Sequence, residues 1–204
     1  IQLSIDLRAY RDSDVKRIEV LSGEQYGILE ELDENPRMAV AGAAGTGKPV
    51  LAAHKAVLEA DGNKPTLLVC FNEPLALHLR SRLSGYTGID VFSFHKLCED
   101  VAREARLPLP PANDRKADFF NRQLPNLFVS GLSSLPNRRY AAIIVDEGQD
   151  FEDAWLENLE LALVDDENAT FYVFYDNNQQ VMNRASNYIR SMNAARRRLR
   201  SNFR

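Results

Sequence analysis

The sequence has little of what marks a specialised structural class. Its 204 residues include only two cysteines, Cys70 and Cys98, which fit neither a metal-binding spacing nor a disulfide framework. No apolar run approaches the length of a membrane span, and we find no signal peptide, lipidation motif, internal repeat or low-complexity stretch. These absences predict a globular protein of a reducing compartment, cytoplasmic and without a membrane partner.

Acidic residues are in small excess over basic ones. The formal net charge is -4, which argues against a general affinity for polyanions. The charge is unevenly placed, since the segment Asp146–Thr170 has many acids and no Lys or Arg, whereas Arg184–Arg204 is rich in arginine and has no acid. The simplest interpretation of the arginine run is a solvated helix face.

Short apolar runs alternate with longer helical patterns along most of the chain. The runs are Arg37–Ala41, Thr66–Phe71, Ile89–Phe94, Tyr140–Val145 and Thr170–Tyr175. Because they are apolar throughout, they predict strands that are covered on both faces, and therefore an α/β sheet between two layers of helices. A further helix is expected over Ser22–Leu32.

Two segments near the middle of the chain differ from this alternation. The proline-rich stretch Leu107–Ala112 has helical pieces on both sides, which predicts a small helical insertion on the sheet over about 99–139. After the fourth run, Phe151, Trp155, Leu159 and Ala162 form a helical stripe, so we expect Trp155 in the core.

A glycine-rich segment follows the first predicted strand. It consists of Gly42, Ala43, Ala44, Gly45, Thr46, Gly47, Lys48 and Pro49. This is the spacing of a phosphate-binding loop, in which backbone N–H groups and a helix N-terminus surround the phosphates and Lys48 supplies a mobile charge. Pro49 departs from the pattern, because the expected Ser or Thr gives Mg²⁺ a hydroxyl. Proline is tolerated in the first turn of a helix, so the loop shape can survive.

The fourth run ends in a second motif. Its residues are Asp146, Glu147, Gly148, Gln149 and Asp150. Carboxylates at the C-terminal end of a buried strand are where phosphate-loop enzymes hold a metal ion and an attacking water. The plainer alternatives are a glycine-rich turn that caps a helix for the first motif and helix-capping acids for the second, although capping does not explain the whole acidic string.

Further segments fall in the order found in one family. They are Leu21–Gln25, Phe71–Ala76, Phe92–Leu97, Asp176–Gln179 and Leu199–Arg204. With the two motifs above, they resemble the conserved segments of UvrD/Rep-like superfamily 1 DNA helicases, although Tyr175 replaces the usual glycine of the third motif. The stretch Cys70–Ala76 is also similar to helicases that carry an N-terminal nuclease-related (NERD) domain.

This resemblance implies a fold, cofactors and roles. The fold would be a RecA-like P-loop NTPase sandwich with a mostly parallel sheet, the cofactors ATP and Mg²⁺, and the partner single-stranded DNA. Lys48 would hold the phosphates, Asp146 would bind Mg²⁺, and Glu147 would orient and deprotonate the attacking water. The other implied contacts are adenine for Gln25, the γ-phosphate for Gln179 and Arg204, and DNA for Asn72, Ser93 and His95.

The resemblance also predicts how the chain is organised. Residues 1–20 would be a lead-in or linker, and residues 21–204 a RecA-like ATP-binding domain that stops at the start of the fourth motif. A second RecA-like domain would complete the ATPase in the full-length chain, so the isolated piece is expected to be monomeric and inactive in unwinding. Two rival functions stay open, a hydrolysis-impaired nucleotide- or DNA-binding module and another P-loop phosphotransferase such as a small kinase.

Overall fold

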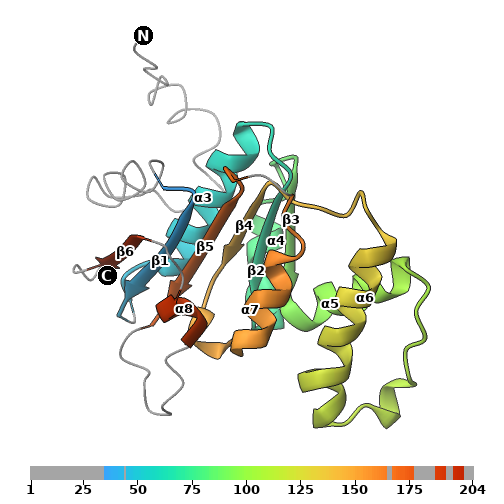
Figure 1. Cartoon of the computed structure of the whole chain (residues 1–204). Helices are drawn as coiled ribbons and strands as arrows, with labels where there is room; N and C mark the ends of the chain where they lie inside the picture. The colour runs from blue at the N-terminus through green and yellow to red at the C-terminus, as the bar shows by residue number, and fades with distance from the viewer. Residues whose placement is uncertain (1–34, 44, 165–166, 177–186, 192–194, 200–204) are drawn as a thin grey trace.

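The computed structural model describes residues 35–43, 45–164, 167–176, 187–191 and 195–199 of the chain. These residues form one six-stranded sheet with helices on both of its faces, as Figure 1 shows. The helix expected over Ser22–Leu32 and the lead-in segment lie outside the described residues. No helix in the described part of the chain is long and apolar enough to cross a membrane.

The sheet is built mainly from the apolar runs of the sequence. Its strands are β1 (Arg37–Gly42), β2 (Thr66–Cys70), β3 (Ile89–Ser93), β4 (Ala142–Val145), β5 (Thr170–Tyr175) and β6 (Ala195–Leu199). The five predicted strands are confirmed, with ends within two residues of the expected positions. Nearly every side chain of β1, β2, β4 and β5 is buried, because helices cover both faces of these strands.

The order of the strands is β3-β2-β4-β5-β1-β6, and each described pair is parallel. Strand β5 therefore lies between β1, which leads into the glycine-rich segment, and β4, which leads into the acidic string. Because the strands are parallel, their C-terminal ends lie along one edge of the sheet. Residues far apart in the sequence, such as Gly42, Asp146 and Asp176, are brought to that edge.

Two hydrophobic cores lie on opposite faces of the sheet. Helices α3 (Lys48–Asp61) and α4 (Glu73–Arg82) cover one face, and α5 (Phe94–Glu104) and α7 (Asp153–Glu160) cover the other. Neighbouring strand residues alternate between the cores, so that Leu68 packs with α3 while Leu67 packs with α5 and α7. The three-layer α/β sandwich expected from the sequence is confirmed.

The predicted insertion is a helical unit that packs on the second core. It follows α5 and comprises the 3₁₀ turn η1 (Ala112–Asp114), the π-helix η2 (Phe119–Gln123) and helix α6 (Leu124–Ser134). Its buried residues Phe119, Leu124 and Phe128 share one core with the sheet, so it is not a separate globule. Trp155 is only 4% exposed and belongs to this core, which confirms its predicted position.

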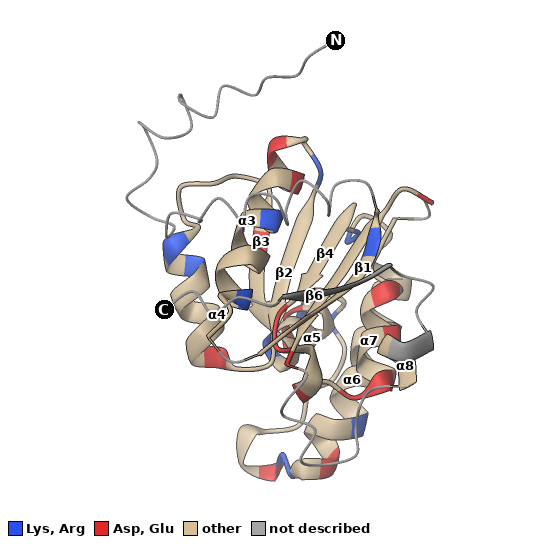
Figure 2. Ribbon diagram, turned by 90° about the vertical axis from the view of Figure 1, so that its left-hand side faces the viewer, with Lys and Arg blue, Asp and Glu red and all other residues tan. Residues whose placement is uncertain are grey.

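The arginine-rich segment forms a structure that the sequence did not predict. Helix α8 (Asn187–Ser191) is short, and β6 pairs with β1 at the edge of the sheet. The interpretation of this run as a helix face is therefore wrong over Ala195–Leu199, where backbone pairing with an open strand edge prevails over the polar side-chain pattern. The acidic segment, in contrast, contains a helix as expected, and Figure 2 shows acidic positions along α7.

Candidate functional site

The glycine-rich loop connects β1 to α3 through two residues in the left-handed conformation. Gly45 has a φ of 82° and Gly47 a φ of 75°, values that side chains disfavour. Thr46 closes the turn, because its Oγ1 donates to the Ala43 carbonyl oxygen at 2.7 Å. Pro49 lies in the first turn of α3, as predicted, and the helix continues beyond it to Asp61. The proline is thus compatible with a helix that begins at the loop.

Lys48 is held inside this loop. Its side chain is 4% exposed, and its Nζ donates to the carbonyl oxygens of Gly42 at 3.0 Å and Ala43 at 3.2 Å. The same Nζ lies 3.8 Å from Oδ2 of Asp176, whose side chain is 3% exposed. The amine is therefore at the centre of the site, between the loop and the end of β5.

Asp146 follows β4 at the same edge and is completely buried. Neither of its carboxylate oxygens has a hydrogen-bond partner among the described residues. Burial, with a further contribution from the negative charge of Glu147, raises the pKa of Asp146 to about 7, although the nearby backbone N–H of Glu147 and the charge of Lys48 oppose the shift. A buried carboxylate without partners is unusual and requires an explanation, and oxygen ligands of this kind suit a hard cation such as Mg²⁺.

Glu147 begins a tight turn that packs against β5. It is not a glycine, yet its φ is 54°, in the left-handed region where strain is common at functional sites. Gly148 is needed at the next position, because a Cβ there would lie 2.4 Å from Cγ1 of Val173. The turn that begins at Glu147 is therefore packed closely against β5.

Gln149 connects this turn to the end of β5. Its Nε2 donates to Oε2 of Glu147 at 2.5 Å, and its Oε1 accepts a hydrogen bond from the backbone N–H of Asp176 at 2.8 Å. A continuous series of polar contacts therefore joins Glu147, Gln149, Asp176 and Lys48. Gln149 and Asp176 were not among the predicted site residues. The only signal for them in the sequence is that Gln149 lies within the acidic string and that Asp176 begins the segment Asp176–Gln179.

The residues expected to contact DNA lie farther along the same edge. β2 and β3 are adjacent, with Cys70 opposite Ser93, so the loops after both strands are neighbours. Asn72 caps α4, because its Oδ1 accepts from the Leu75 N–H at 3.2 Å, while the residue itself is exposed. Ser93 is 3% exposed and its Oγ donates to Glu73, so it joins β3 to the start of α4.

His95 lies in a cluster of aromatic rings. Its centroid is 5.7 Å from that of Phe71 and 5.3 Å from that of Trp155, and its Nε2 is 3.1 Å from the Phe120 carbonyl oxygen. Burial lowers the pKa of His95. Phe71 is 38% exposed and is stacked on Trp155 with an interplanar angle of 8°. The cluster therefore presents part of one ring to solvent at the carboxyl ends of β2 and β3.

The π-helix η2 supports this aromatic cluster from the insertion. Trp155 Nε1 donates to the Asn121 carbonyl oxygen at 3.2 Å, next to the Phe120 carbonyl that contacts His95. Two successive carbonyl groups of the π-helix thus bind side chains from α5 and α7. The insertion is fixed to the two segments that follow β3 and the acidic string.

Some predicted site residues lie outside the described part of the chain. They are Gln25, Ala44, Gln179 and Arg204. Among the described residues, Lys48, Asp146 and Glu147 meet at one edge, and no group of three or more His, Cys, Asp or Glu side chains is arranged to hold a metal ion. A cation here would have few protein ligands, which Mg²⁺ tolerates because it commonly keeps several waters.

Comparison of the sequence with models of known families gives no match, and comparison with characterised proteins gives none either. Solved structures do match. The Pif1 helicase from Candida albicans is similar with a TM-score of 0.56 and 17% identity, over 91% of this chain and 41% of that chain. A Bacteroides Pif1 helicase in complex with ADP-AlF3 and ssDNA matches with a TM-score of 0.48 and 17% identity, over 90% of this chain and 43% of that one.

At 17% identity such a similarity shows the fold alone. The conclusion about the fold is based on the Candida albicans helicase, whose TM-score is 0.56. The chain has a RecA-like fold, an α/β sandwich with a parallel sheet, which is similar to the fold of that helicase. It spans less than half of the length of each of these two helicases.

Proposed function

We propose that this chain is the ATP-binding and hydrolysing motor domain of a UvrD/Rep-like DNA helicase or translocase, which couples ATP hydrolysis to movement on single-stranded DNA. The observation that carries the proposal is that one edge of the sheet holds both Lys48 in its loop and Asp146, a buried carboxylate whose oxygens have no hydrogen-bond partner among the described residues. The RecA-like fold and the order of the motifs support the same conclusion.

Each described residue of the edge then has a chemical role. Lys48 would bind the β- and γ-phosphates of ATP, and Asp146 would hold Mg²⁺ directly or through a water molecule. Glu147 would orient the attacking water and accept its proton. Bound Mg²⁺ supplies charge stabilisation for the transferred phosphoryl group, so protein groups mainly position the reactants. Gln25, Gln179 and Arg204 are assigned to adenine and the γ-phosphate by their motifs.

Single-stranded DNA would lie across the loops after β2 and β3. Asn72 is exposed there and can contact a phosphate, and the half-exposed ring of Phe71 offers a surface for base stacking. Ser93 and His95 are largely occupied by contacts within the protein, so their contribution is to fix the shape of this surface. In the full-length protein, a second RecA-like domain would close over the nucleotide and convert hydrolysis into movement.

Pro49 supports a second candidate, a module that binds nucleotide but hydrolyses it poorly. The side chain has no hydroxyl for Mg²⁺ and the residue has no N–H for a phosphate. The acidic string is complete in this chain, however, with Glu147 held by Gln149. A module that only binds nucleotide does not need an ordered carboxylate for water, and we therefore favour the hydrolysing motor.

Calorimetric titration of Mg²⁺-ATP tests the nucleotide site directly. Lys48→Ala should weaken binding at least tenfold relative to the wild-type chain, because it removes the cation next to the phosphates. Lys64→Ala is a matched control, since Lys64 also contacts an acid, Glu59, but lies at the amino-terminal edge before β2. Unchanged affinity in the Lys48→Ala variant would exclude this loop as a nucleotide site. If the full-length protein hydrolyses ATP but DNA does not stimulate the reaction, the motor function is contradicted. The alternative of another P-loop phosphotransferase would then remain.

A further inference from the structure

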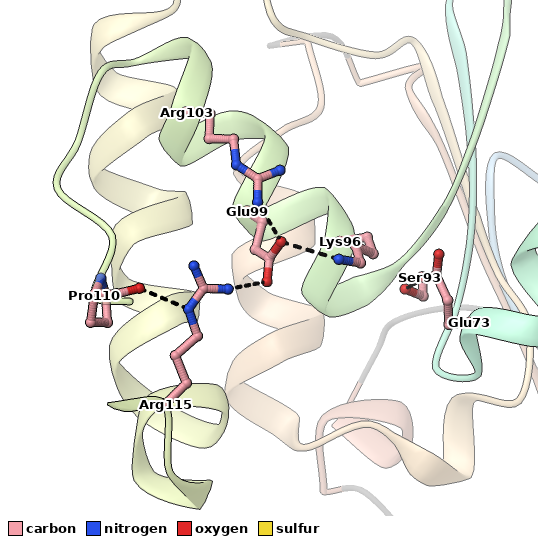
Figure 3. Close-up of polar contacts among 7 residues, drawn as sticks. All are labelled: Glu73, Ser93, Lys96, Glu99, Arg103, Pro110 and Arg115. Carbon is pink, nitrogen blue, oxygen red and sulfur yellow. Dashed lines mark hydrogen bonds and ion pairs between the residues drawn. The ribbon is translucent and has the colours of Figure 1, made fainter. Parts of the chain in front are cut away.

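Helix α5 carries an ion cluster in which positive charge exceeds negative charge. Glu99 is buried at 4% exposure, and its carboxylate contacts Arg115 at 2.8 Å, Arg103 at 2.9 Å and Lys96 at 3.3 Å. Figure 3 shows the three cations converging on this one acid. The four groups together have a formal charge of +2, the sum of three cations and one carboxylate.

Arg115 alone is sufficient to neutralise the buried Glu99 carboxylate. Its side chain is only 14% exposed, and its Nε also donates to the Pro110 carbonyl oxygen at 3.0 Å. Its guanidinium lies over the Phe119 ring, 5.3 Å from the centroid. Arg115 therefore neutralises Glu99 and fastens the segment before η2 to α5.

Lys96 and Arg103 are different, because most of each side chain is in solvent. They are 52% and 59% exposed, so solvent screens the attraction of each cation to the buried Glu99 carboxylate. The neighbouring acids Asp100 and Glu104 both contact Arg138, at 2.8 and 3.0 Å, and this one cation offsets one of their two charges. With these three groups included, four cations and three carboxylates leave a formal charge of +1 on this part of the surface. We call Lys96 and Arg103 the α5 basic pair.

The α5 basic pair begins close to the carboxyl ends of β2 and β3, where the proposed DNA site lies, and continues away from them along α5. Helix α5 begins directly after Ser93, and Lys96 is the cation nearest to that end in Figure 3. Arg103 follows seven residues later on the same helix face, about 10 Å farther along the axis. The half-exposed ring of Phe71 lies beside His95 at the start of the helix. Aromatic rings next to rows of cations are a combination that binds single-stranded nucleic acid.

We propose that Lys96 and Arg103 form a binding surface for the phosphate backbone of single-stranded nucleic acid, which extends the strand's path from the ends of β2 and β3 along α5 toward the insertion. This inference rests on the proposed function, because it deepens the assignment of the DNA-binding edge. Glu99 has a positioning role, since it holds both cations on one side of the helix.

Salt dependence of binding to an oligo(dT) probe tests this surface. Fluorescence anisotropy would measure the affinity of the whole chain for the probe over a series of salt concentrations. Each phosphate contact with a single strand contributes about -0.7 to the slope of log K against log salt. The double variant Lys96→Ala/Arg103→Ala should therefore reduce the steepness of the slope by about 1.4. The charge-conserving variant Lys96→Arg/Arg103→Lys should keep the wild-type slope.

Arg37→Ala/Lys64→Ala is the matched control. It also removes one Arg and one Lys that contact acids, but from the amino-terminal edge of the sheet. A control slope equal to that of wild type, with the loss confined to the α5 variant, supports the surface. If both double variants lose the same slope, the effect is one of net charge and the inference is overturned.

Two further outcomes separate this inference from the proposed function. A wild-type slope in the α5 variant, with DNA-stimulated hydrolysis intact in the full-length protein, would overturn the surface and leave the motor standing. Binding of poly-glutamate that competes with oligo(dT) and depends equally on Lys96 and Arg103 would identify an acidic protein segment as the partner and overturn the nucleic-acid assignment.

Discussion

At the scale of single residues, Pro49 is the position where this chain departs most from a phosphate-loop ATPase. The structure accommodates it in the first turn of α3, so the substitution Pro49→Thr should restore both a hydroxyl and a backbone N–H without disturbing the helix. A hydrogen bond from the N–H to a charged phosphate contributes roughly 1.5–3 kcal/mol, which corresponds to tenfold to hundredfold tighter binding. We expect that gain when Mg²⁺-ATP is titrated into both chains by calorimetry. Equal affinities would show that a water already replaces the missing groups.

Asp146 gives the chain a stability that depends on pH. Its pKa is raised to about 7 from 3.8, so the folded state holds the proton more tightly than the unfolded state does. The resulting stabilisation is complete below about pH 4 and is lost as the pH rises through 7, and its size is at most about 4 kcal/mol.

The isosteric substitution Asp146→Asn should remove this dependence and make the chain more stable than wild type at pH 8. Urea unfolding of both proteins at pH 5 and pH 8 is the measurement, and Asp118→Asn, at an exposed carboxylate, is the control. Added Mg²⁺ should stabilise the wild-type chain at pH 8 and leave Asp146→Asn unaffected. A variant that is less stable than wild type at pH 8 would show that the carboxylate is not a buried, uncompensated charge.

At the scale of elements, the most informative contact is the one that Gln149 makes between the acidic turn and β5. Gln149→Leu removes both hydrogen bonds, and Glu147 then loses the group that orients it. Because small displacements of a catalytic group can reduce rates up to about a hundredfold, we expect DNA-stimulated hydrolysis by the full-length protein to fall tenfold or more. The affinity for Mg²⁺-ATP should stay within about twofold, since the hydrogen bonds that hold Lys48 to the Gly42 and Ala43 carbonyls remain.

The matched control for this prediction is Gln123→Leu, which removes a glutamine that contacts Asp118 on the insertion. It should leave both the rate and the affinity unchanged. A parallel loss of affinity and rate in Gln149→Leu would instead indicate that the whole edge has been distorted.

Much of the element order could be predicted from the sequence, and its limits have physical causes. Strands β1, β2, β4 and β5 are buried on both faces, so their composition alone identifies them. Strand β6 is held by backbone pairing to β1, which arginine side chains neither favour nor prevent. Lys48 and Asp146 belong to local motifs and were predicted. The contact of Lys48 with Asp176 depends on β5 lying between β1 and β4, and no local pattern encodes that order.

At the scale of the whole molecule, the proposed motor would need a second RecA-like domain to act beside this one. Unwinding requires a second surface that moves against this one, so the isolated 204-residue chain should not separate duplex DNA. A strand-displacement assay with a fluorescent forked duplex is the measurement, and binding of Mg²⁺-ATP by the same preparation shows that the protein is intact. Detectable unwinding by this chain alone would refute the two-domain scheme.

The π-helix Phe119–Gln123 also constrains how the insertion can vary in length. A π-helix contains one residue more than the α-helical turn it replaces, so deleting one residue there would turn everything before it by about 100° relative to α6. The carbonyls of Phe120 and Asn121 would then no longer face His95 and Trp155. The loop over residues 105–111 makes no hydrogen bond to His95 or Trp155 in the described structure, so its length is less constrained than that of the π-helix, although the Pro110 carbonyl accepts from Arg115 and Leu109 packs on the core. We therefore expect insertions and deletions among relatives to accumulate in that loop and to spare the π-helix.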